Sequence, residues 1–174
     1  MRGNVWKFSG ILDVDWEICS YLLVRQLADN GPVTEEMLGE HCLVNVDPDF
    51  PKKVRKGDFV VAGPNMGYGH DHDHASMALK GAGVAAVLCE SSAPYFLRNS
   101  IDHGLPVIEL PGVMAAVESG DDLEVDLRAG KVVNHTRPGS ELTFTPLPDF
   151  LLDVLDAGGI YPMLKPRHEG SADR

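Results

Sequence analysis

The densest chemistry in the sequence is a short run in which three histidines alternate with two aspartates. His70, Asp71, His72, Asp73 and His74 follow one another without interruption. An imidazole changes its charge near neutral pH, and a neighbouring carboxylate can orient it through a hydrogen bond. The run therefore offers His–Asp pairs for proton transfer, and we expect at least one of these residues to act in acid–base chemistry or in substrate binding.

Two other interpretations of the histidine run stay open. On a regular helix, positions 70 and 74 share one face while position 72 points almost the opposite way. Three imidazoles can therefore meet at one metal ion only in an extended or irregular segment. We expect no metal ligand in this chain, but a stand-alone metal-binding protein that uses His70, His72 and His74 is an alternative. The run can equally be a solvated helix start with one structural histidine.

The histidines follow a loop that contains two glycines, Gly67 and Gly69. Glycine lets the backbone turn tightly and approach a ligand, and the helix predicted after the loop presents N–H groups and the positive end of its dipole. A carboxylate would bind well at such a place. The loop has no Walker A pattern and lacks the third glycine of a dinucleotide fingerprint, so it does not indicate a nucleotide.

The elements around this loop alternate between strands and helices. Phe59–Ala62, a β-branched run, predicts a buried strand before the loop, and helix formers follow it from Ala75 to Gly81. The next predicted elements are a strand at Val84–Cys89, a helix at Tyr95–Asp102 and a strand at Pro106–Leu110. This order with short connections favours a mainly parallel sheet that is covered on both faces.

The two ends of the chain carry other patterns. Before the sheet, we expect a strand at Val5–Phe8, a helix at Trp16–Leu27, a short helix capped by Thr34 that ends near His41, and a break of regular structure at residues 47–51. After it, we expect a hairpin of Leu123–Leu127 and Val132–Asn134, a strand at Leu142–Thr145, and a last helix that opens at residues 147–149, runs through Leu155 and ends at Gly158 and Gly159. The predicted class is α/β, with mixed parallel and antiparallel sheets and flanking helices.

Length and charge narrow the class of protein. The chain has 174 residues, and its 15 Lys and Arg against 26 Asp and Glu give a net charge of −11 with neutral histidines. This charge repels phosphate backbones and anionic lipid heads, so we expect neither a nucleic acid nor a membrane as partner. The length fits one domain, which we place at residues 1–167, followed by a polar tail at residues 168–174.

The sequence shows neither a membrane anchor nor a cysteine cluster. No apolar run is long enough for a membrane span, and the start lacks the apolar core of a signal peptide, so we expect a cytoplasmic protein. Cys19, Cys42 and Cys89 are odd in number, far apart and without a C-x-x-C pair. This pattern argues against a disulfide framework and against a self-contained zinc or iron–sulfur site. Another chain would have to hold any iron–sulfur cluster.

The order of segments resembles the small subunit of the isopropylmalate dehydratase family, which is related to the swivelling C-terminal domain of aconitase. Arg2–Phe8 resembles the family's opening strand. Leu12–Asp15, together with Ile18, Tyr21 and Leu22, resembles its I-D-T-D-x-I-I-P-x-x-Y-L segment, and residues 47–63 resemble the approach to its active-site loop. The later matches are Asn65-x-Gly67-x-Gly69 in place of N-F-G-C-G, then residues 82–87, Phe96-x-Arg98-Asn99, residues 104–106 and the ending at residues 151–162.

This resemblance implies a β/β/α swivelling domain that closes over a large subunit bearing a [4Fe-4S] cluster, with no cofactor bound by this chain. In such enzymes the cluster acts as a Lewis acid on the substrate, while a loop of the small subunit supplies groups for proton transfer and carboxylate binding. The implied reaction is reversible dehydration and hydration of a small branched hydroxy-dicarboxylate such as an alkylmalate, as in leucine biosynthesis. The isolated chain would be inactive alone and could form a homo-oligomer.

The active-site loop departs from the family pattern. Where the family reads G-S-S-R-E-H-A, residues 69–75 read G-H-D-H-D-H-A. His70 stands at the serine associated with proton abstraction, and His72 at the arginine that clamps a carboxylate. A histidine can act as a base or attract a carboxylate, but it lacks the guanidinium fork. We expect His70 and Asp71 to be catalytic, and His72, Asn65, Gly67 and Gly69 to bind substrate.

The segment that selects the substrate in this family follows Tyr21-Leu22, and in this chain it reads Leu23-Val24-Arg25. An apolar Leu23 would favour an alkyl substituent, and Arg25 could replace the missing positive charge. Tyr21, Leu23 and Arg25 are therefore candidate substrate-binding residues. The alternatives are core packing for residues 21–24 and a surface position for Arg25.

Other residues carry weaker signals. Asp13 and Asp15 either order the specificity loop or only form a turn. Arg98 and Asn99 match a family pair, but a role in helix capping or domain stability explains them equally well. A regulatory or binding module of the same fold, which has lost the chemistry along with the serine and the arginine, is an alternative to the enzyme subunit.

Overall fold

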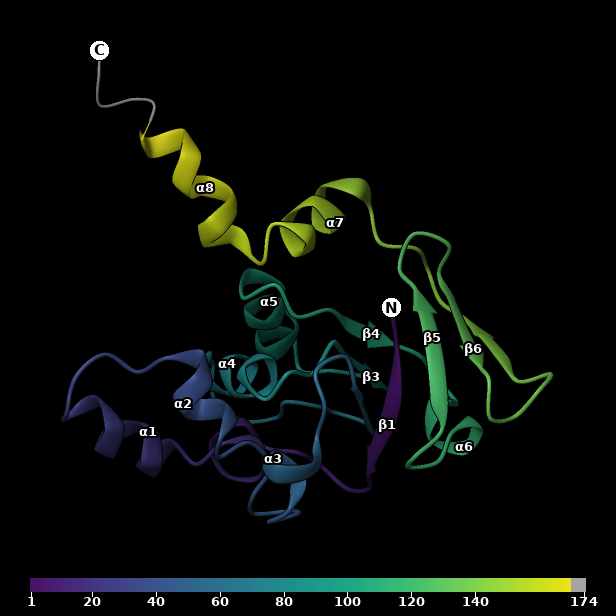
Figure 1. The fold of residues 1–174 in the computed structure, drawn as a ribbon, viewed down its shortest axis with the longest axis horizontal. Helices are drawn as coiled ribbons and strands as arrows, with labels where there is room; N and C mark the ends of the chain where they lie inside the picture. The colour runs from purple at the N-terminus through teal and green to yellow at the C-terminus, as the bar shows by residue number, and fades with distance from the viewer. Residues whose placement is uncertain (170–174) are drawn as a thin grey trace.

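The computed structural model describes the backbone of residues 1–169 and the side chains of residues 1–165. Seven strands in this part form one sheet in the order β4-β3-β2-β1-β5-β6-β7 (Figure 1). The neighbours from β1 to β4 are parallel, whereas β5, β6 and β7 join β1 in antiparallel pairs. The strands are Arg2–Phe8 (β1), Phe59–Ala62 (β2), Ala86–Cys89 (β3), Val107–Glu109 (β4), Asp122–Asp126 (β5), Lys131–Asn134 (β6) and Glu141–Thr143 (β7). The predicted α/β class with mixed sheets is confirmed.

The two central strands, β2 and β3, are buried along their whole length. Successive side chains of a strand point to opposite faces, so Val60 and Val87 enter one core while Val61 and Leu88 enter a second core behind the sheet. Both faces of the parallel section are therefore covered, which explains the continuous apolar runs of these strands.

Helices cover the first core on one side of the parallel strands (Figure 1). In chain order they are the π-helix η1 (Val14–Ile18), α1 (Tyr21–Ala28), α2 (Glu35–Gly39), α3 (Phe50–Lys53), α4 (His74–Gly81) and α5 (Pro94–Asp102). The second core is closed by α6 (Val113–Ala116) and by the β5–β6 hairpin, through residues such as Val113 and Leu123.

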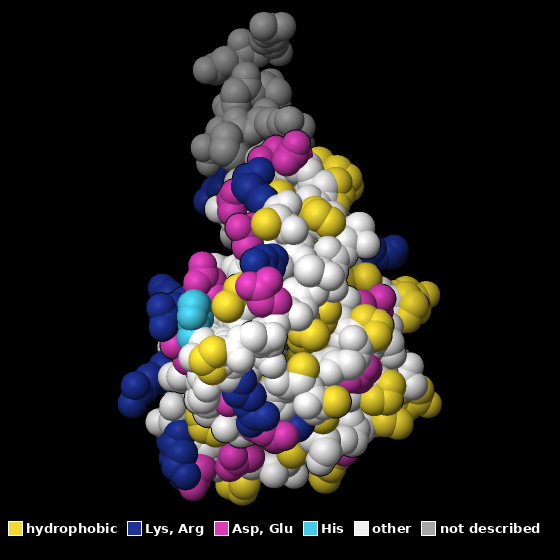
Figure 2. Space-filling model, turned by 90° about the vertical axis from the view of Figure 1, so that its right-hand side faces the viewer, with side chains coloured by type: hydrophobic (Ala, Val, Ile, Leu, Met, Phe, Trp, Pro, Cys, Tyr) yellow, Lys and Arg dark blue, Asp and Glu magenta, His cyan; other side chains and the backbone are white. Residues whose placement is uncertain are grey.

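The antiparallel section is the predicted hairpin with one further strand. Leu123 and Val132 point into the second core, and Lys131 forms an ion pair with Glu141 across β6 and β7 at 2.9 Å. Figure 2 looks onto this side of the molecule and shows acidic side chains interspersed among basic ones, without a continuous basic patch on this face.

The prediction of one continuous helix at Trp16–Leu27 is wrong, because the chain divides it into η1 and α1. Cys19, between the two helices, is extended at φ −156° and ψ 125°. The backbone carbonyls of Val14 and Cys19 both accept hydrogen bonds from the His74 ring at 3.0 Å. Contacts with a distant part of the chain therefore replace the hydrogen bonds that would continue the helix.

The expected break at residues 47–51 is also wrong in part, since α3 begins inside it at Phe50. The Phe50 ring is buried and meets Trp6 edge-on, with 5.1 Å between the ring centroids. Pro51 lies in the first turn of the helix, where the N–H that proline lacks has no helical partner. A tertiary contact thus stabilises a short helix that the local sequence disfavours.

The C-terminal part contains one helix more than the sequence indicates. The predicted last helix is α7 (Asp149–Asp156), and the chain continues past its glycines into α8 (Ile160–Glu169). α8 extends two residues into the segment expected as a polar tail, and residues 170–174 lie outside the described residues. No helix within residues 1–169 combines the length and the apolar character that crossing a membrane requires.

A glycine fixes the loop between β2 and α4 against α5. Gly67 has φ +75°, and a β-carbon at this position would collide with the ring of Phe96. The N–H of Gly67 donates to the carbonyl of Leu12 at 3.0 Å, which ties the loop to the segment before η1. Both the left-handed backbone and the close approach therefore require glycine.

An ion cluster fixes the other end of the same loop. His103, at the end of α5, lies 3.1 Å from Asp73 and 3.5 Å from Glu35 of α2, and Glu35 pairs with Lys80 of α4 at 3.2 Å. The hydrogen bond with Asp73 raises the pKa of His103, burial opposes this, and the charges of Asp73 and Glu35 raise it further. When the ring is protonated, it holds α2, α4 and α5 together beside the loop.

Replacing Gly67 by alanine is expected to destabilise the protein by about 2–4 kcal/mol, because backbone strain and overpacking against Phe96 act together. Gly139→Ala is the matched control, since Gly139 has φ +88° and nothing within 4 Å of its would-be β-carbon. Its cost should be the backbone strain alone, about 1–2 kcal/mol. Equal losses in urea unfolding would show that Phe96 does not constrain the loop.

The His103 cluster predicts a stability contribution that depends on pH. A raised folded-state pKa stabilises the protein fully below the unfolded value, near 6.5, and this contribution is lost as the pH rises through the folded value. Since Asp73 is largely exposed, we expect Asp73→Asn to cost roughly 0.5–1 kcal/mol at about pH 5.5 and less at about pH 9. Asp71→Asn, two residues away, should change the free energy of unfolding by less than about 0.5 kcal/mol. A cost of Asp73→Asn that does not change with pH would contradict this role of His103.

Candidate active site

The candidate site lies where the loop after β2 meets the segment that enters η1. Residues 63–73 form no regular helix or strand between β2 and α4. The N–H of Val14 donates to the carbonyl of Tyr68 at 2.8 Å, beside the hydrogen bond from Gly67 to Leu12. Two loops that are more than 50 residues apart in the chain are therefore joined along their backbones, which brings the start of η1 to the histidine run.

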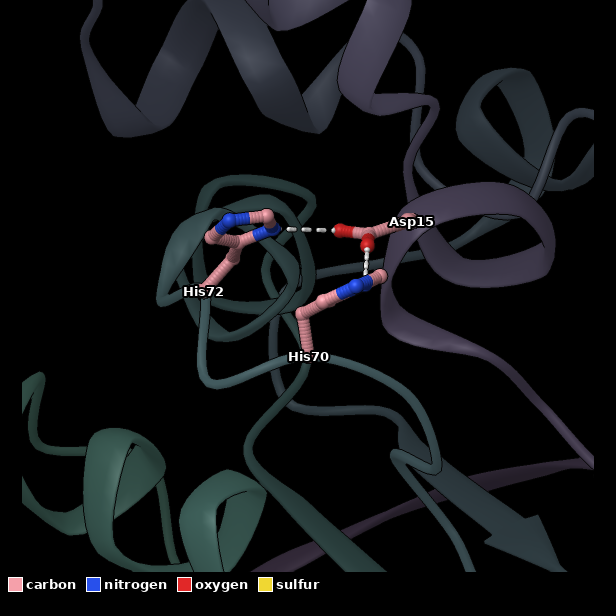
Figure 3. A group of neighbouring side chains, drawn as sticks. All are labelled: Asp15, His70 and His72. Atoms are coloured by element: carbon pink, nitrogen blue, oxygen red, sulfur yellow. Dashed lines mark hydrogen bonds and ion pairs between the residues drawn. The ribbon is translucent and has the colours of Figure 1, made fainter.

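The carboxylate of Asp15 lies between two of the three histidines (Figure 3). Its two oxygens contact different rings, Oδ2 at 2.6 Å from His70 Nδ1 and Oδ1 at 2.8 Å from His72 Nδ1. The exposed fractions of the side chains are 75% for His70, 32% for His72 and 19% for Asp15. One half-buried carboxylate therefore orients two imidazoles, and one of these stands largely in solvent.

Asp15 is itself held in place by its neighbours in the chain. Its N–H donates to the Asp13 carboxylate at 2.7 Å, and this cap opens η1. Partial burial raises the pKa of Asp15, but the hydrogen bonds from His72 and His70 outweigh burial and leave the pKa below its usual value. Asp15 is therefore ionised at neutral pH and can only accept hydrogen bonds, so both Nδ1 atoms carry a proton.

Ring stacking holds the second histidine. The rings of Tyr21 and His72 stack with 4.3 Å between centroids and an interplanar angle of 9°, and His70 stacks on His72 at 5.3 Å and 22°. Tyr21 opens α1, so this stack connects α1 with the loop. Of the predicted substrate-binding residues, Tyr21 and His72 are thus in direct contact.

His74 has a different role from the other two histidines. It is buried, and its Nε2–H donates to the carbonyls of Val14 and Cys19. Burial lowers the pKa of His74 and outweighs these hydrogen bonds, so the ring is neutral at pH 7. His74 is therefore the structural histidine of the run, and its Nε2 is engaged by backbone carbonyls.

The structure pairs His70 with Asp15, whereas the predicted catalytic partner, Asp71, lies on the surface. The Asp71 side chain makes no hydrogen bond or ion pair with any residue that the structure describes, and its carbonyl accepts from the Asn99 amide at 3.0 Å. Asn99 thereby supports the loop, while Arg98 lies over the Tyr95 ring at 6.0 Å. A catalytic role for Asp71 stays a prediction.

The loop backbone presents free donors beside the two histidines. Within the described part of the chain, the N–H groups of residues 70–72 donate to no other residue. Asn65 has a left-handed backbone at φ +57° and donates its N–H to Ser91 Oγ at 3.0 Å, and Gly69 has φ +121°. Asn65, Gly67 and Gly69 thus shape the loop before the free N–H groups, and their roles in substrate binding stay predictions.

Leu23 and Arg25 lie on α1, in the helix that begins with Tyr21. Leu23 is half-buried, while Arg25 is exposed and forms no ion pair among the described residues. Their roles in substrate selection stay predictions.

Asp15 is the member of this cluster for which the sequence indicates only a turn or loop ordering. Asp15 lies 55 residues from His70 in the sequence, so no local pattern indicates that the two side chains are in contact. The available signal was the pair of acidic residues Asp13 and Asp15 within a segment that the family resemblance places next to the specificity loop.

Comparisons with known proteins show the family of the chain. A family model described as the aconitase C-terminal domain matches residues 24–112. The chain is 43% identical over 165 residues to the isopropylmalate/citramalate isomerase small subunit of Methanocaldococcus jannaschii, a match that covers 95% of this chain and 94% of the relative. It is 44% identical to 3-isopropylmalate dehydratase small subunit 1 of Methanopyrus kandleri, over 95% of this chain and 92% of the relative.

A solved structure shows the same fold. The crystal structure of 3-isopropylmalate dehydratase (leuD) from Methanocaldococcus jannaschii superposes with a TM-score of 0.83 at 32% identity, covering 96% of this chain and 94% of the other. The sequence relatives and the shared fold span nearly the whole chain. The chain therefore belongs to the family of 3-isopropylmalate dehydratase small subunits, with the fold of the aconitase C-terminal domain.

Proposed function

We propose that this chain is the small subunit of a heteromeric hydro-lyase that reversibly dehydrates a small branched hydroxy-dicarboxylate such as an alkylmalate. Family membership supports the reaction class and the need for a large subunit, since the relatives are named as dehydratase or isomerase small subunits. An alkylmalate would place the reaction in leucine biosynthesis. The single observation that carries the catalytic role is the Asp15 carboxylate that orients the exposed His70 ring.

An iron–sulfur cluster would belong to the large subunit, because the cysteines of this chain do not fit one. Protein-bound clusters are held by several cysteine thiolates that converge on the irons, and no three cysteines converge among the residues that the structure describes. Cys19, Cys42 and Cys89 are buried and free, and burial raises the pKa of Cys19 to about 11 and that of Cys89 to about 12. We therefore place the [4Fe-4S] cluster on the partner, where such a group would supply a Lewis acid for the substrate hydroxyl.

His70 is positioned to move the proton. With its Nδ1 proton bonded to Asp15, the neutral ring keeps a lone pair on Nε2. In dehydration, Nε2 takes the proton from the carbon next to a substrate carboxylate, and the electron pair of that C–H bond forms the double bond. The hydroxyl on the neighbouring carbon leaves as water when it takes up a proton from a second proton-transfer group, and hydration reverses these steps. Asp15 is a positioning residue that acts through His70, since it fixes the ring orientation and stabilises the imidazolium. Asp71, directly after His70, is the second proposed proton-transfer group.

Carboxylate binding falls to the groups beside His70. The free N–H groups of residues 70–72 and the start of α4 favour an anion, and His72 stands where the family carries its arginine. These groups lack a guanidinium fork, so we propose that the substrate carboxylate is held by several single hydrogen bonds. Leu23 would contact the alkyl substituent, and Arg25 would add the missing positive charge.

The site is also suited to a protein partner. Several large apolar side chains are exposed on the segments that build or flank it, namely Ile11 (54%), Trp16 (60%), Leu22 (68%), Tyr68 (59%) and Tyr95 (56%). Exposed apolar groups of this kind mark interaction surfaces. They support a model in which a large subunit closes over Asp15, His70 and His72. A cytoplasmic location and a homo-oligomer of the isolated chain stay predictions.

Mixing the chain with its large subunit under anaerobic, iron-replete conditions tests the proposed reaction. We expect an absorbance change from an unsaturated diacid when an alkylmalate is added, and no change with either subunit alone. Absence of turnover with a series of alkylmalates and related hydroxy-diacids would contradict the proposal.

His70→Gln should lower kcat about 100-fold or more in this complex, because the base is lost, and Asp15→Asn should lower kcat because the ring is no longer oriented. His135→Gln is the matched control, since His135 also pairs with a carboxylate, Glu124 at 2.9 Å, but on the β-hairpin. If His70→Gln and Asp71→Asn both left turnover unchanged, the chain would act as a regulatory module instead.

Arg25→Ala should raise KM for the dicarboxylate roughly tenfold with a smaller effect on kcat, because the proposed role of Arg25 is binding. Arg55→Ala, an exposed arginine between α3 and β2, is the control. Identical kinetic constants for both variants would remove Arg25 from the substrate site.

A further inference from the structure

Three side chains of the candidate site also form a constellation suited to a metal ion. The ligand atoms of Asp15, His70 and His72 all lie within 4.8 Å of one another. The loop is irregular at this point, which meets the condition for histidines at positions 70 and 72 to converge. His74 does not join them, because its Nε2–H is engaged by the carbonyls of Val14 and Cys19.

The short distances from the two Nδ1 atoms to the Asp15 oxygens allow a metal site in which one ion takes the place of the two Nδ1 protons. Zinc binds imidazole nitrogen and carboxylate oxygen at about 2.0–2.1 Å, which places tetrahedral ligand atoms about 3.3 Å apart. The Nδ1 atoms of His70 and His72 now lie 2.6 and 2.8 Å from the Asp15 oxygens. Each of these two nitrogen–oxygen pairs must therefore separate by about 0.6 Å. The two contacts go to different oxygens of Asp15 and the three ligand atoms lie within 4.8 Å of one another, so the remaining ligand pairs must approach by no more than about 1.5 Å.

Neighbouring groups hold the ligands in place, as metal sites require. Tyr21 stacks on His72, and the N–H of Asp15 is fixed by the Asp13 carboxylate. Two imidazoles and one carboxylate are a donor set that suits zinc and other late divalent transition metals. Since His70 is mostly exposed, the remaining coordination positions face solvent.

We propose that Asp15, His70 and His72 bind one divalent transition-metal ion, with Zn²⁺ as the fitting example, and that the ion switches off the base. Each neutral imidazole keeps one proton, which moves from Nδ1 to Nε2 as Nδ1 takes the metal, so no proton is released. His70 Nε2 then carries a hydrogen and cannot accept a proton from a substrate. The binding site stands on geometry alone, whereas the switch rests on the proposed function.

Calorimetric titration of the metal-free full chain with Zn²⁺ tests the site. We expect one ion per chain, and affinity reduced at least 100-fold in His70→Gln and in Asp15→Asn. His135→Gln should bind like the original protein. His70 is largely exposed, so its loss leaves the core unchanged, and circular dichroism checks the fold of each variant. No stoichiometric uptake, or uptake unchanged in His70→Gln and Asp15→Asn, would overturn the site.

A second measurement tests the switch. The chain is loaded with Zn²⁺, freed of excess metal and only then mixed with the large subunit, so that the partner meets no free zinc. We expect at least a tenfold loss of turnover, restored when the chain is stripped by a chelator before mixing. Full turnover of the loaded chain would overturn the switch.

The two measurements also separate this inference from the proposed function. A chain that supports turnover but takes up no metal would refute the metal site and leave the proposed function intact. A chain that binds metal at these residues but never supports turnover would uphold the site and contradict the proposed function.

Discussion

The site depends on one carboxylate that serves two imidazoles. Asp15 is ionised, half-buried and fixed by the turn that opens η1, so its two oxygens determine where His70 and His72 point. Because the carboxylate accepts a hydrogen bond from Nδ1–H, the Nε2 atom of each neutral ring keeps its lone pair free for another partner. The same contact joins two segments that are remote in sequence, and for this reason the packing of η1 against α4 is a condition for the chemistry as well as for the fold.

That packing explains why His74 is structural, whereas His70 is exposed and His72 is half-buried. His74 lies at the start of α4 and packs against η1. Its ring donates to the carbonyls of Val14 and Cys19, which would otherwise accept hydrogen bonds within a continuous helix. His70 and His72 precede the helix and stay at the surface. The chain belongs to a family of hydro-lyase small subunits, and its histidines and aspartates stand where the resemblance leads one to expect serine, arginine and glutamate.

Much of the fold could be predicted from local patterns, because buried strands such as Phe59–Ala62 are continuous apolar runs and Thr34 caps the short helix α2. The split of the helix at Cys19 and the short helix at Phe50 could not, since each is stabilised by a side chain from elsewhere. For the site, the sequence located the histidine run but not the carboxylate that contacts it. The nearest aspartate in sequence to His70 is Asp71, whereas the carboxylate in contact comes from residue 15.

The protonation pattern of the three histidines tests the central claim most directly. Nitrogen-detected NMR of the metal-free chain, above the pH range in which free histidine titrates, reports which ring nitrogen carries the proton. We expect the proton on Nδ1 of His70 and His72 and on Nε2 of His74, with the first two signals altered by Asp15→Asn. Protons on Nε2 of His70 and His72, or signals unaffected by Asp15→Asn, would contradict the central claim.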